Sequence, residues 1–376
     1  MAGSAENAPT WRSSFPAMGT RVDIIGWGGD GMAIVNAVVG VVARHEDMWS
    51  VFWPSSEVSQ LNATVRDAAR GDGASRCGSD SAQAGPGLVV SEDTDRLLRD
   101  ALALAEATGG TFNPLIGPLV AAWDVKAMRA AYVAGVPLPP APAADAVEAA
   151  SRASSWGLLS RVGEQRWAMG VPCESVGGVD VASPRLDLGG IAKGYTADAC
   201  RDLAVSMGAR GVLVSVGTSS VSVFGTRADG SSWRAGLRDP HGGPTSVAGV
   251  VELPAGGMSS LSTSGDNLGP LGRVGVGCAA GSTSDRRARE TPRETSVGGG
   301  RVFDHHIIDP RTGYPAHAGV RQVSVVASSG VLAEALSTAL LVEPSIDVPD
   351  VVARWARVTG TPASAKVVDL VRAAQG

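Results

Sequence analysis

Three strand-like segments follow one another in the second half of the chain, with no helical pattern between them. The composition of a short, partly buried strand recurs at residues 211–216, 220–224 and 246–253, and further strands are predicted at 21–27, 166–171 and 321–327. Amphipathic helical spacing occurs at 32–49, from 91 to the glycines at 109 and 110, and at 143–154, 332–341 and 348–358. Because several strands are consecutive, the pattern favours an α+β fold over a strictly alternating parallel sheet.

Glycine and proline are abundant, which indicates many turns and some irregular insertions. The 376 residues include 49 glycines and 22 prolines, while the hydrophobic fraction of 44% is typical of a globular protein rather than a disordered one. Two stretches rich in small and polar residues, near 63–90 and 269–300, are predicted to be irregular insertions, and residues 1–10 a flexible N-terminus.

The charge pattern argues against function classes that depend on a strongly basic surface. The formal net charge is −5 and no long basic run occurs, so we expect no nucleic-acid partner. No stretch reaches the roughly 20 apolar residues of a membrane span, and the first residues show no signal-peptide pattern. We therefore expect no stable membrane insertion and a cytoplasmic location. The four cysteines lie far apart, which gives little support to a thiolate metal cage or a disulfide framework.

The segment at residues 186–198, LDLGGIAKGYTAD, has the features of an anion-binding turn. A short apolar lead is followed by Gly189, Gly190, Lys193 and Gly194, and then by a helical tail. Backbone amides at a helix N-terminus can approach an anion, and Lys193 adds a positive charge. The spacing matches neither a Walker loop nor a GxGxxG dinucleotide fingerprint. Taken alone, a glycine-rich turn between a strand and a helix explains the segment equally well.

The segment at residues 305–315, HHIIDPRTGYP, places His306 beside a tight turn. The turn residues are Asp309, Pro310, Thr312 and Gly313. Histidine exchanges a proton near neutral pH, so His306 is a candidate base or ligand. A surface hairpin with a hydrogen-bonded histidine is the alternative, although two adjacent histidines among only five in the chain favour a functional role.

A carboxylate and a hydroxyl share one face of the helix predicted at 332–341. Glu334 and Thr338 are four residues apart, and both side chains could reach a hard cation such as Mg²⁺. A capping pair or a solvent-exposed pair would have the same spacing, so this spacing does not decide between a metal site and a structural pair.

Eight sequence blocks, taken together and in order, resemble the ApbE-type FAD:protein FMN transferases, also called flavin transferases. The blocks are FPAMGT (15–20), SEVSQLN (56–62), GGTFNPLIGPLVAAW (109–123), LDLGGIAKGYTAD, WRAGLRDP (233–240), STSGD (262–266), HHIIDPRTGYP and EALSTAL. The resemblance implies an ApbE-like α+β fold, with mostly antiparallel sheets packed with helices. It also implies that residues 11–376 form a single domain whose nucleotide site lies in a cleft between two lobes.

The resemblance further implies an activity. Enzymes of this type transfer FMN from FAD to a threonine or serine hydroxyl of an acceptor protein and release AMP, with Mg²⁺ at the diphosphate. The implied cofactor is Mg²⁺, the implied substrate is FAD, and the implied partner is an acceptor flavoprotein that carries a Thr/Ser flavinylation motif. Many members carry an export signal or a lipid anchor, which makes an exported or membrane-associated location the alternative to a cytoplasmic one.

Matching the motifs residue by residue implies a site assembled from most of these blocks. His306 matches the histidine next to the reacting phosphates and is assigned as the general base, with Lys193 as the second catalytic residue. The implied metal ligands are Gly190 (through its carbonyl), Glu334, Ser337 and Thr338. Phe52 stands where the family often has a flavin-stacking tyrosine, and the implied FAD contacts are Met18, Phe52, Thr111, Phe112, Asn113, Asp187, Lys193 and Ile308.

The chain departs from the family pattern at three positions of this site. Glu334 replaces the usual aspartate, Asn113 replaces a common aspartate, and SVGTSS (215–220) stands where Asn followed by Gly-Gly-Asp is usual. Two alternatives to the transferase therefore stay open: an FAD diphosphatase that delivers FMN to water, and a flavin-binding protein that has lost catalysis. An NAD-type dehydrogenase is disfavoured because the fingerprint spacing is absent.

Overall fold

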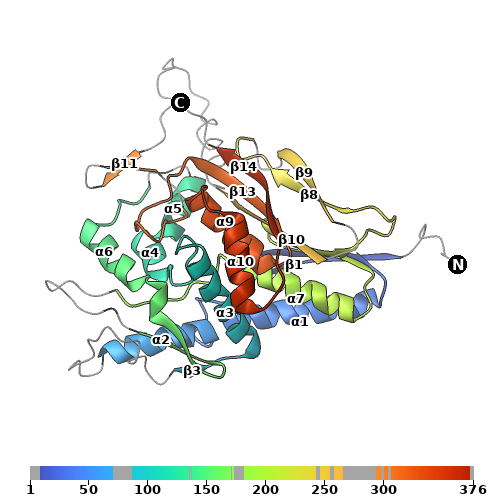
Figure 1. The fold of residues 1–376 in the computed structure, drawn as a ribbon, viewed down its shortest axis with the longest axis horizontal. Helices are drawn as coiled ribbons and strands as arrows, with labels where there is room; N and C mark the ends of the chain where they lie inside the picture. Colours follow the sequence, from blue (N-terminus) through green and yellow to red (C-terminus); the bar gives the residue numbers. More distant parts are fainter. Residues whose placement is uncertain are drawn as a thin grey trace, which may run out of the picture.

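The computed structural model describes residues 9–70, 87–134, 136, 138–170, 172, 182–242, 246–254, 258–265, 294–297, 300–303 and 306–372. The largest element within these ranges is a seven-stranded sheet in which every neighbouring pair of strands is antiparallel (Figure 1). In spatial order its strands are β1 (Thr10–Ala17), β2 (Thr20–Trp27), β6 (Gly211–Val216), β7 (Ser220–Gly225), β10 (Met258–Gly265), β13 (Val320–Ala327) and β14 (Ala365–Arg372).

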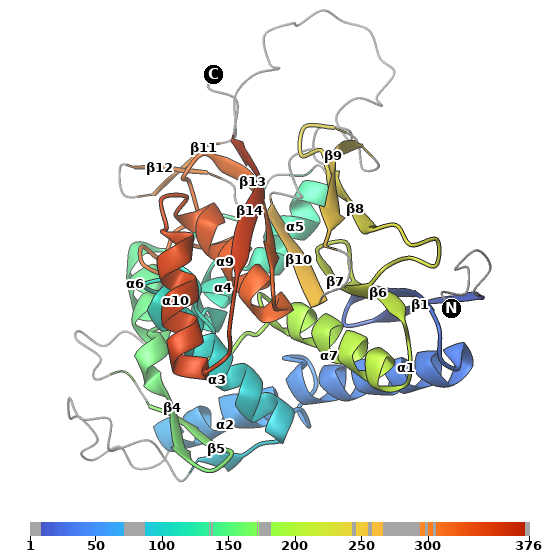
Figure 2. The ribbon, with the colours of Figure 1, turned by 45° about the vertical axis from the view of Figure 1, so that its right-hand side comes forward.

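Three helices cover one face of this sheet (Figure 2). α7 (Ala192–Ser206) packs on β6 and β7, α9 (Gly330–Val342) packs on β10 and β13, and α1 (Gly31–Trp49) lies alongside α7. Side chains alternate between the faces of a strand, so paired residues form rows across the sheet. One row on the helix-covered face runs through Val22, Val216, Ser220, Ser262 and Val325. The covered face is therefore apolar towards its sides and lined with serine in the middle.

α9 is the most deeply buried helix of the described part of the chain. Every residue of α9 except Thr338 is buried, and its leucines belong to the main apolar core together with residues of α3 (Glu92–Ala107) and β13. A helix that is apolar on all sides is typically enclosed by the rest of the protein. The one carboxylate of α9, Glu334, is therefore held inside the molecule.

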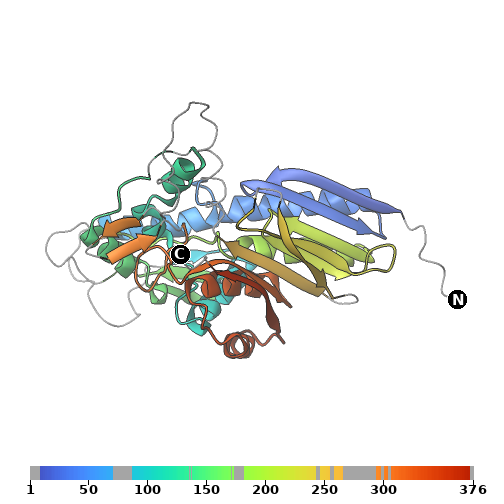
Figure 3. The same cartoon turned by 90° about the horizontal axis from the view of Figure 1, so that it is seen from above.

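The remaining elements surround this centre. Figure 3 shows the β11–β12 pair, in orange, at the end of the molecule opposite the blue strands β1 and β2. The helices are α2 (Glu57–Arg70), α4 (Gly117–Ala122), α5 (Val125–Ala134), α6 (Ala144–Ala153) and α10 (Val348–Thr359), with a short 3₁₀ turn at Trp156–Leu158. The smaller sheets are β3 (Leu88–Val89) with β5 (Arg166–Met169) and β4 (Leu159–Gly163), β8 (Trp233–Arg238) with β9 (Val247–Leu253), and β11 (Glu294–Val297) with β12 (Gly300–Phe303).

The predicted α+β fold with mostly antiparallel sheets is confirmed, whereas the limits of the irregular segments were partly wrong. Residues 63–70 continue α2, because Leu61 and Val65 extend one buried face of that helix. Residues 88–89 form β3, and 294–297 and 300 belong to the β11–β12 pair. Thr10, predicted to be flexible, pairs with Trp27 in the central sheet. Residues 1–8, 71–86 and 266–293 lie outside the described residues.

No helix of the described residues combines the length and the apolar character that are needed to cross a lipid bilayer.

Candidate functional site

The segment before α7 folds into a tight turn that leads directly into the helix. The Asp187 carboxylate accepts a hydrogen bond from the Gly189 N–H (Oδ1···N 2.9 Å), and the Lys193 ammonium donates to the Gly189 carbonyl (2.8 Å). Gly189 and Gly190 are both exposed, and Ile191, which precedes α7, offers no side-chain cap. An uncapped helix N-terminus beside a lysine and exposed backbone favours an anion.

Two other sequence blocks hold this turn in place. The side chain of Asn62 makes two buried hydrogen bonds to the backbone of Leu186, from Nδ2 to the carbonyl (3.2 Å) and from the backbone N–H to Oδ1 (2.7 Å). The N–H of Asp187 donates to the carbonyl of Pro114 (2.9 Å). Segments that are distant in sequence, SEVSQLN, GGTFNP and LDLGG, therefore meet at the start of α7.

The predicted FAD contacts at 111–113 lie beside the same turn but are nearly buried. A Cβ atom added to Gly190 would lie 3.7 Å from the Phe112 ring, which places the two residues in contact distance. The Thr111 hydroxyl donates to the carbonyl of Thr108 (2.9 Å). Asn113 donates to the Ser154 carbonyl (2.6 Å) and accepts from the Leu115 N–H (2.8 Å). Asn113 thus anchors its own loop, and the FAD contacts stay predictions.

Lys193 and Glu334 meet between α7 and α9. Glu334 is 4% exposed, and its Oε1 lies 3.5 Å from the Lys193 ammonium and accepts a short hydrogen bond from the Ser220 hydroxyl. The other carboxylate oxygen, Oε2, is also buried but has no hydrogen-bond partner among the described residues. A buried carboxylate oxygen without a partner is costly unless a cation or a donor reaches it. This oxygen is therefore a candidate cation ligand.

The hydroxyl groups of α9 face the sheet next to Glu334. Ser264 Oγ lies 2.8 Å from Ser337 Oγ and 3.1 Å from Thr338 Oγ1, and Ser262 Oγ lies 3.2 Å from Ser337 Oγ. Ser337 is fully buried, whereas Thr338 is partly exposed. The described residues hold no group of three or more His, Cys, Asp or Glu side chains arranged for a metal. One carboxylate with hydroxyl and carbonyl oxygens is instead a hard donor set, which fits Mg²⁺.

The crossing of α7 and α9 sets the distance between Lys193 and Glu334. Gly194 and Gly330 face each other so closely that a Cβ on Gly194 would lie 2.3 Å from the Gly330 carbonyl oxygen. Asp198, further along α7, accepts a hydrogen bond from the Gly330 N–H (2.7 Å) and from the hydroxyls of Ser222 and Ser260. A carboxylate at a helix N-terminus stabilises that end. Asp198 therefore fixes the start of α9, one turn before Glu334.

A buried histidine supports α7 from the side of α1. His45 is 1% exposed, and its Nδ1 lies 2.9 Å from Thr196 Oγ1, while the Trp49 and Tyr195 rings pack against the imidazole. Burial lowers the pKa of His45 to about 4, which the carboxylate of Asp93 only partly opposes. His45 is therefore neutral at pH 7, and it packs under the residues that directly follow Lys193.

His306 and Ile308 lie on a turn between the β11–β12 pair and β13. Ile308 pairs with Pro315, and the Gly313 carbonyl accepts a hydrogen bond from the Trp123 indole (2.8 Å). The side chain of Ile308 is buried in an apolar cluster with Leu119 and Trp123. The turn fixes the backbone next to His306, which is partly buried; its role as a base stays a prediction, and His305 lies outside the described residues.

Two predicted flavin contacts lie on turns. Met18, in the turn between β1 and β2, has a φ of +51° and packs against the apolar clusters on both sides. Phe52, in the connection between α1 and α2, is 76% exposed, and its ring centre lies 5.8 Å from the Lys126 ammonium. An aromatic ring this exposed is available for stacking, although no described contact joins it to Lys193 or Glu334.

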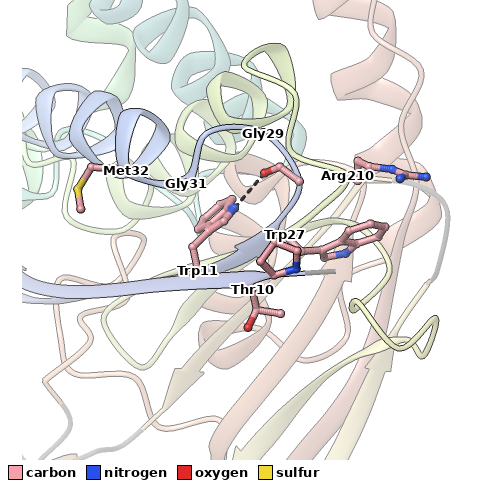
Figure 4. Close-up of a pocket in the computed structure, with 9 residues that line it drawn as sticks. Thr10, Trp11, Trp27, Gly29, Gly31, Met32 and Arg210 are labelled. Carbon is pink, nitrogen blue, oxygen red and sulfur yellow. Dashed lines mark hydrogen bonds between the residues drawn. The ribbon is translucent and has the colours of Figure 1, made fainter. Parts of the chain in front are cut away.

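A surface depression elsewhere shares no residue with the predicted site. It is lined by Trp11, Trp27, Met32, Arg210 and glycines of the β2–α1 connection (Figure 4). The Trp11 indole donates to the Gly28 carbonyl (2.9 Å), and the Arg210 guanidinium carbon lies 4.9 Å from the centre of the Trp27 ring. Because the indole N–H of Trp11 is already paired and the lining is mostly apolar, we assign no catalytic role to this depression.

Sequence reasoning gave no role to several residues that shape the site. Ser220 and Asp198 lay within quoted segments, and Asn62 ended a family block, but their partners are remote in the chain. A serine on a strand carries no signal of the residue it will meet across a helix. Only the three-dimensional pairing identifies these residues.

Comparison with known proteins agrees with this architecture. The FAD:protein FMN transferase of Treponema pallidum is 33% identical over 271 residues, which cover 70% of this chain and 63% of that protein. The enzyme of that name from Rhodobacter capsulatus is 28% identical over 357 residues, which cover 92% of this chain and 54% of that protein. The matched part of the chain thus spans less than two thirds of the length of these curated relatives.

Solved structures show the same fold. The crystal structure of the ApbE protein from Thermotoga maritima gives a TM-score of 0.65 at 24% identity and covers 97% of both chains. The flavin transferase ApbE from Vibrio cholerae gives a TM-score of 0.63 at 21% identity and covers 98% of both chains. The sequence matches the model of the ApbE family over residues 18–276 and 282–359, which together are most of the chain. The chain therefore belongs to the ApbE family.

Proposed function

We propose that this protein transfers FMN from FAD to a threonine or serine hydroxyl of an acceptor protein, releasing AMP, in a reaction that needs Mg²⁺. Membership of the ApbE family and similarity to proteins named FAD:protein FMN transferase support this proposal. The observation that carries it is the contact of Lys193 with Glu334 beside the exposed Gly189–Gly190 turn. A lysine, a carboxylate with one open oxygen and accessible backbone are what cleavage of a diphosphate requires.

The diphosphate of FAD would bind at the start of α7. The Lys193 ammonium, which is 26% exposed as a side chain, can turn from the Gly189 carbonyl to a phosphate oxygen. Asp187 keeps the turn closed through its bond to the Gly189 N–H. The flavin and the nucleotide would contact Met18, Phe52, Thr111, Phe112, Asn113, Asp187 and Ile308.

The residues present fit a magnesium ion. Its ligands would be Glu334 through the unpaired Oε2, the carbonyl of Gly190, and the hydroxyls of Ser337 and Thr338. When bound, Mg²⁺ would neutralise negative charge that builds up on the diphosphate as the bond breaks. Lys193 adds a second positive charge to the same region and lies 3.5 Å from Oε1 of Glu334.

His306 would act as the general base. It would accept the proton of the acceptor hydroxyl while that oxygen forms a bond to the FMN phosphorus. The phosphoanhydride bond between FMN and AMP breaks at the same phosphorus, and AMP leaves with the bridging oxygen. The acceptor then carries FMN through a phosphoester bond. The rigid turn formed by Ile308 and Pro315 would keep the histidine in place during this transfer.

Mass spectrometry of an acceptor domain tests the proposal. The purified protein is incubated with FAD, Mg²⁺ and a domain that carries a candidate flavinylation motif, and free AMP and FMN are measured in parallel. We expect the acceptor to gain the mass of FMN less one water, with one AMP released per acceptor. Free FMN with an unmodified acceptor would instead identify an FAD diphosphatase, and bound but intact FAD would identify a flavin-binding protein without catalysis.

Two substitutions separate binding from catalysis. His306→Ala should abolish AMP release and leave FAD binding nearly unchanged, because the ring is proposed to act on the acceptor proton. Glu334→Ala should shift the dependence of the rate on Mg²⁺ to higher concentrations, because one proposed ligand is lost. A His306→Ala variant that turns over at the wild-type rate would refute the assignment of the base.

A further inference from the structure

The two oxygens of the Glu334 carboxylate have different surroundings. Oε1 accepts a hydrogen bond from Ser220 and faces the Lys193 ammonium, whereas Oε2 has no hydrogen-bond partner among the described residues. Both oxygens belong to a side chain that is 4% exposed, so water does not explain the difference. Ser220 and Lys193 therefore both contact Oε1, and Oε2 is left open.

The direction of the hydrogen bonds around Ser220 follows from proton counting. A carboxylate only accepts, so the single hydroxyl proton of Ser220 must point to Glu334. Ser219 Oγ lies 3.3 Å from Ser220 Oγ, and in that contact Ser219 must then be the donor. A chain of two hydroxyls thus ends on Glu334 Oε1, and the bond to the charged oxygen is of the stronger, charge-assisted kind.

The backbone of Ser220 is held by strands on both sides. Ser220 pairs with Val216 of β6 and with Ser262 of β10, so its side chain must point to the face covered by α9. Ser219 is fixed as well, because its carbonyl accepts a hydrogen bond from the Thr263 N–H (2.9 Å). A hydroxyl on so constrained a strand has little freedom to follow a moving carboxylate.

We infer that Ser220 is a positioning residue that holds Glu334 by Oε1 and thereby directs Oε2 towards the bound cation. Groups that orient a metal ligand through a hydrogen bond commonly change metal affinity by about 10-fold or more when removed. Lys193 contacts the same oxygen from a longer distance, 3.5 Å, and its flexible chain cannot orient the carboxylate plane alone. The inference rests on the proposed role of Glu334 as a cation ligand.

Titration with Mn²⁺, followed by electron paramagnetic resonance, tests the inference without using turnover. Mn²⁺ stands in for Mg²⁺ because both prefer oxygen ligands. The protein is titrated with and without FAD, and the variants are Ser220→Ala, Ser220→Thr, Glu334→Ala and, as a matched control, Ser324→Ala. Ser324 is a fully buried serine of β13 whose hydroxyl bonds to Thr263 (2.9 Å), and it alternates with Val323 and Val325, which belong to the main apolar core. Ser324→Ala therefore removes a similar hydrogen bond on the other face of the sheet.

We expect Ser220→Ala to weaken Mn²⁺ binding about 10-fold, while FAD affinity measured without metal stays at the wild-type value. Ser220→Thr, which keeps the hydroxyl, should retain the Mn²⁺ affinity of the wild type. Ser324→Ala should lower the melting temperature but leave the Mn²⁺ affinity unchanged. If Ser220→Ala bound Mn²⁺ as tightly as the wild type while Glu334→Ala bound it clearly more weakly, the role of Ser220 would be overturned and the proposed cation site would stand. Equal Mn²⁺ affinity of the wild type and Glu334→Ala would overturn the proposed cation site and the inference with it.

Discussion

Replacement of Gly194 by alanine should separate α7 from α9 and disturb the site that they form. The new Cβ would lie 2.3 Å from the carbonyl oxygen of Gly330, 2.5 Å from its carbonyl carbon and 3.1 Å from Glu334 Cγ. The first two atoms are backbone, so no side chain can rotate away, and the helices must move apart by about 1 Å to reach normal contact. That movement would also shift the carboxylate that is proposed to bind the cation.

The expected cost follows from two opposing effects. Overpacking of a well-packed contact costs about 1–3 kcal/mol, and the backbone contact here places Gly194→Ala near the upper end. Alanine in a helix regains at most about 1 kcal/mol relative to glycine, and Gly194 lies in the first turn of α7. The net loss in free energy of unfolding should therefore be about 2 kcal/mol.

Gly40 of α1 offers a matched control. It lies inside a helix, and the nearest atom to an added Cβ is the end of the Arg44 side chain at 4.0 Å. Gly40→Ala should therefore stabilise the protein by about 1 kcal/mol, about 3 kcal/mol above Gly194→Ala. Urea unfolding of both variants measures this difference, provided that the m-values agree. If Gly194→Ala proved as stable as Gly40→Ala, the close helix crossing described above would be refuted.

Three further predictions concern residues around the start of α7. The pKa of His45 is about 4 in the folded protein and about 6.5 in the unfolded chain, so the free energy of unfolding should fall by up to about 3 kcal/mol as the pH is lowered from 6.5 to 4. His45→Gln should flatten this part of a series of urea denaturations at different pH. Asn62→Ala should cost about 2 kcal/mol in urea unfolding, since two buried backbone groups of Leu186 lose their partner, whereas exposed Gln60→Ala should be neutral. Lys193→Met should abolish AMP release and lower the free energy of unfolding by about 2 kcal/mol, because the buried Glu334 carboxylate loses its countercharge. Adding Glu334→Gln should restore stability but not turnover, and a double variant that stays destabilised would contradict the pairing.

Local patterns predicted the elements that are stabilised by one buried face. The apolar spacing of Ile34, Val38 and Val42 predicted α1, and the short apolar runs predicted β6 and β7 almost to the residue. The end of α2 was missed because residues 63–70 carry one large apolar side chain, Val65, among alanines and polar residues. β1 was missed because its pairing with β2 is what orders it, while Pro16 and the serines weaken its own strand signal.

The site was predicted as a set of residues but not as a geometry. The blocks identified Lys193 and Glu334, and the structure brings these two together. Nothing local in the sequence relates Ser220 to Glu334, because that contact depends on the order of strands in the sheet and on the crossing of two helices. Two of the three departures noted in the sequence, Glu334 and SVGTSS, are in contact through the hydrogen bond from Ser220 to Glu334.

The enclosure of α9 has a consequence for how the protein is made. α3, α7 and β10 leave the ribosome before α9, and the apolar surfaces that will cover this helix stay open until it has been synthesised. A nascent chain of this kind exposes core surface to water, which favours capture by chaperones or association with other unfinished chains. For the same reason, Lys193 is synthesised long before the carboxylate that it will meet. The Lys193–Glu334 contact can therefore form only after α9 has been synthesised.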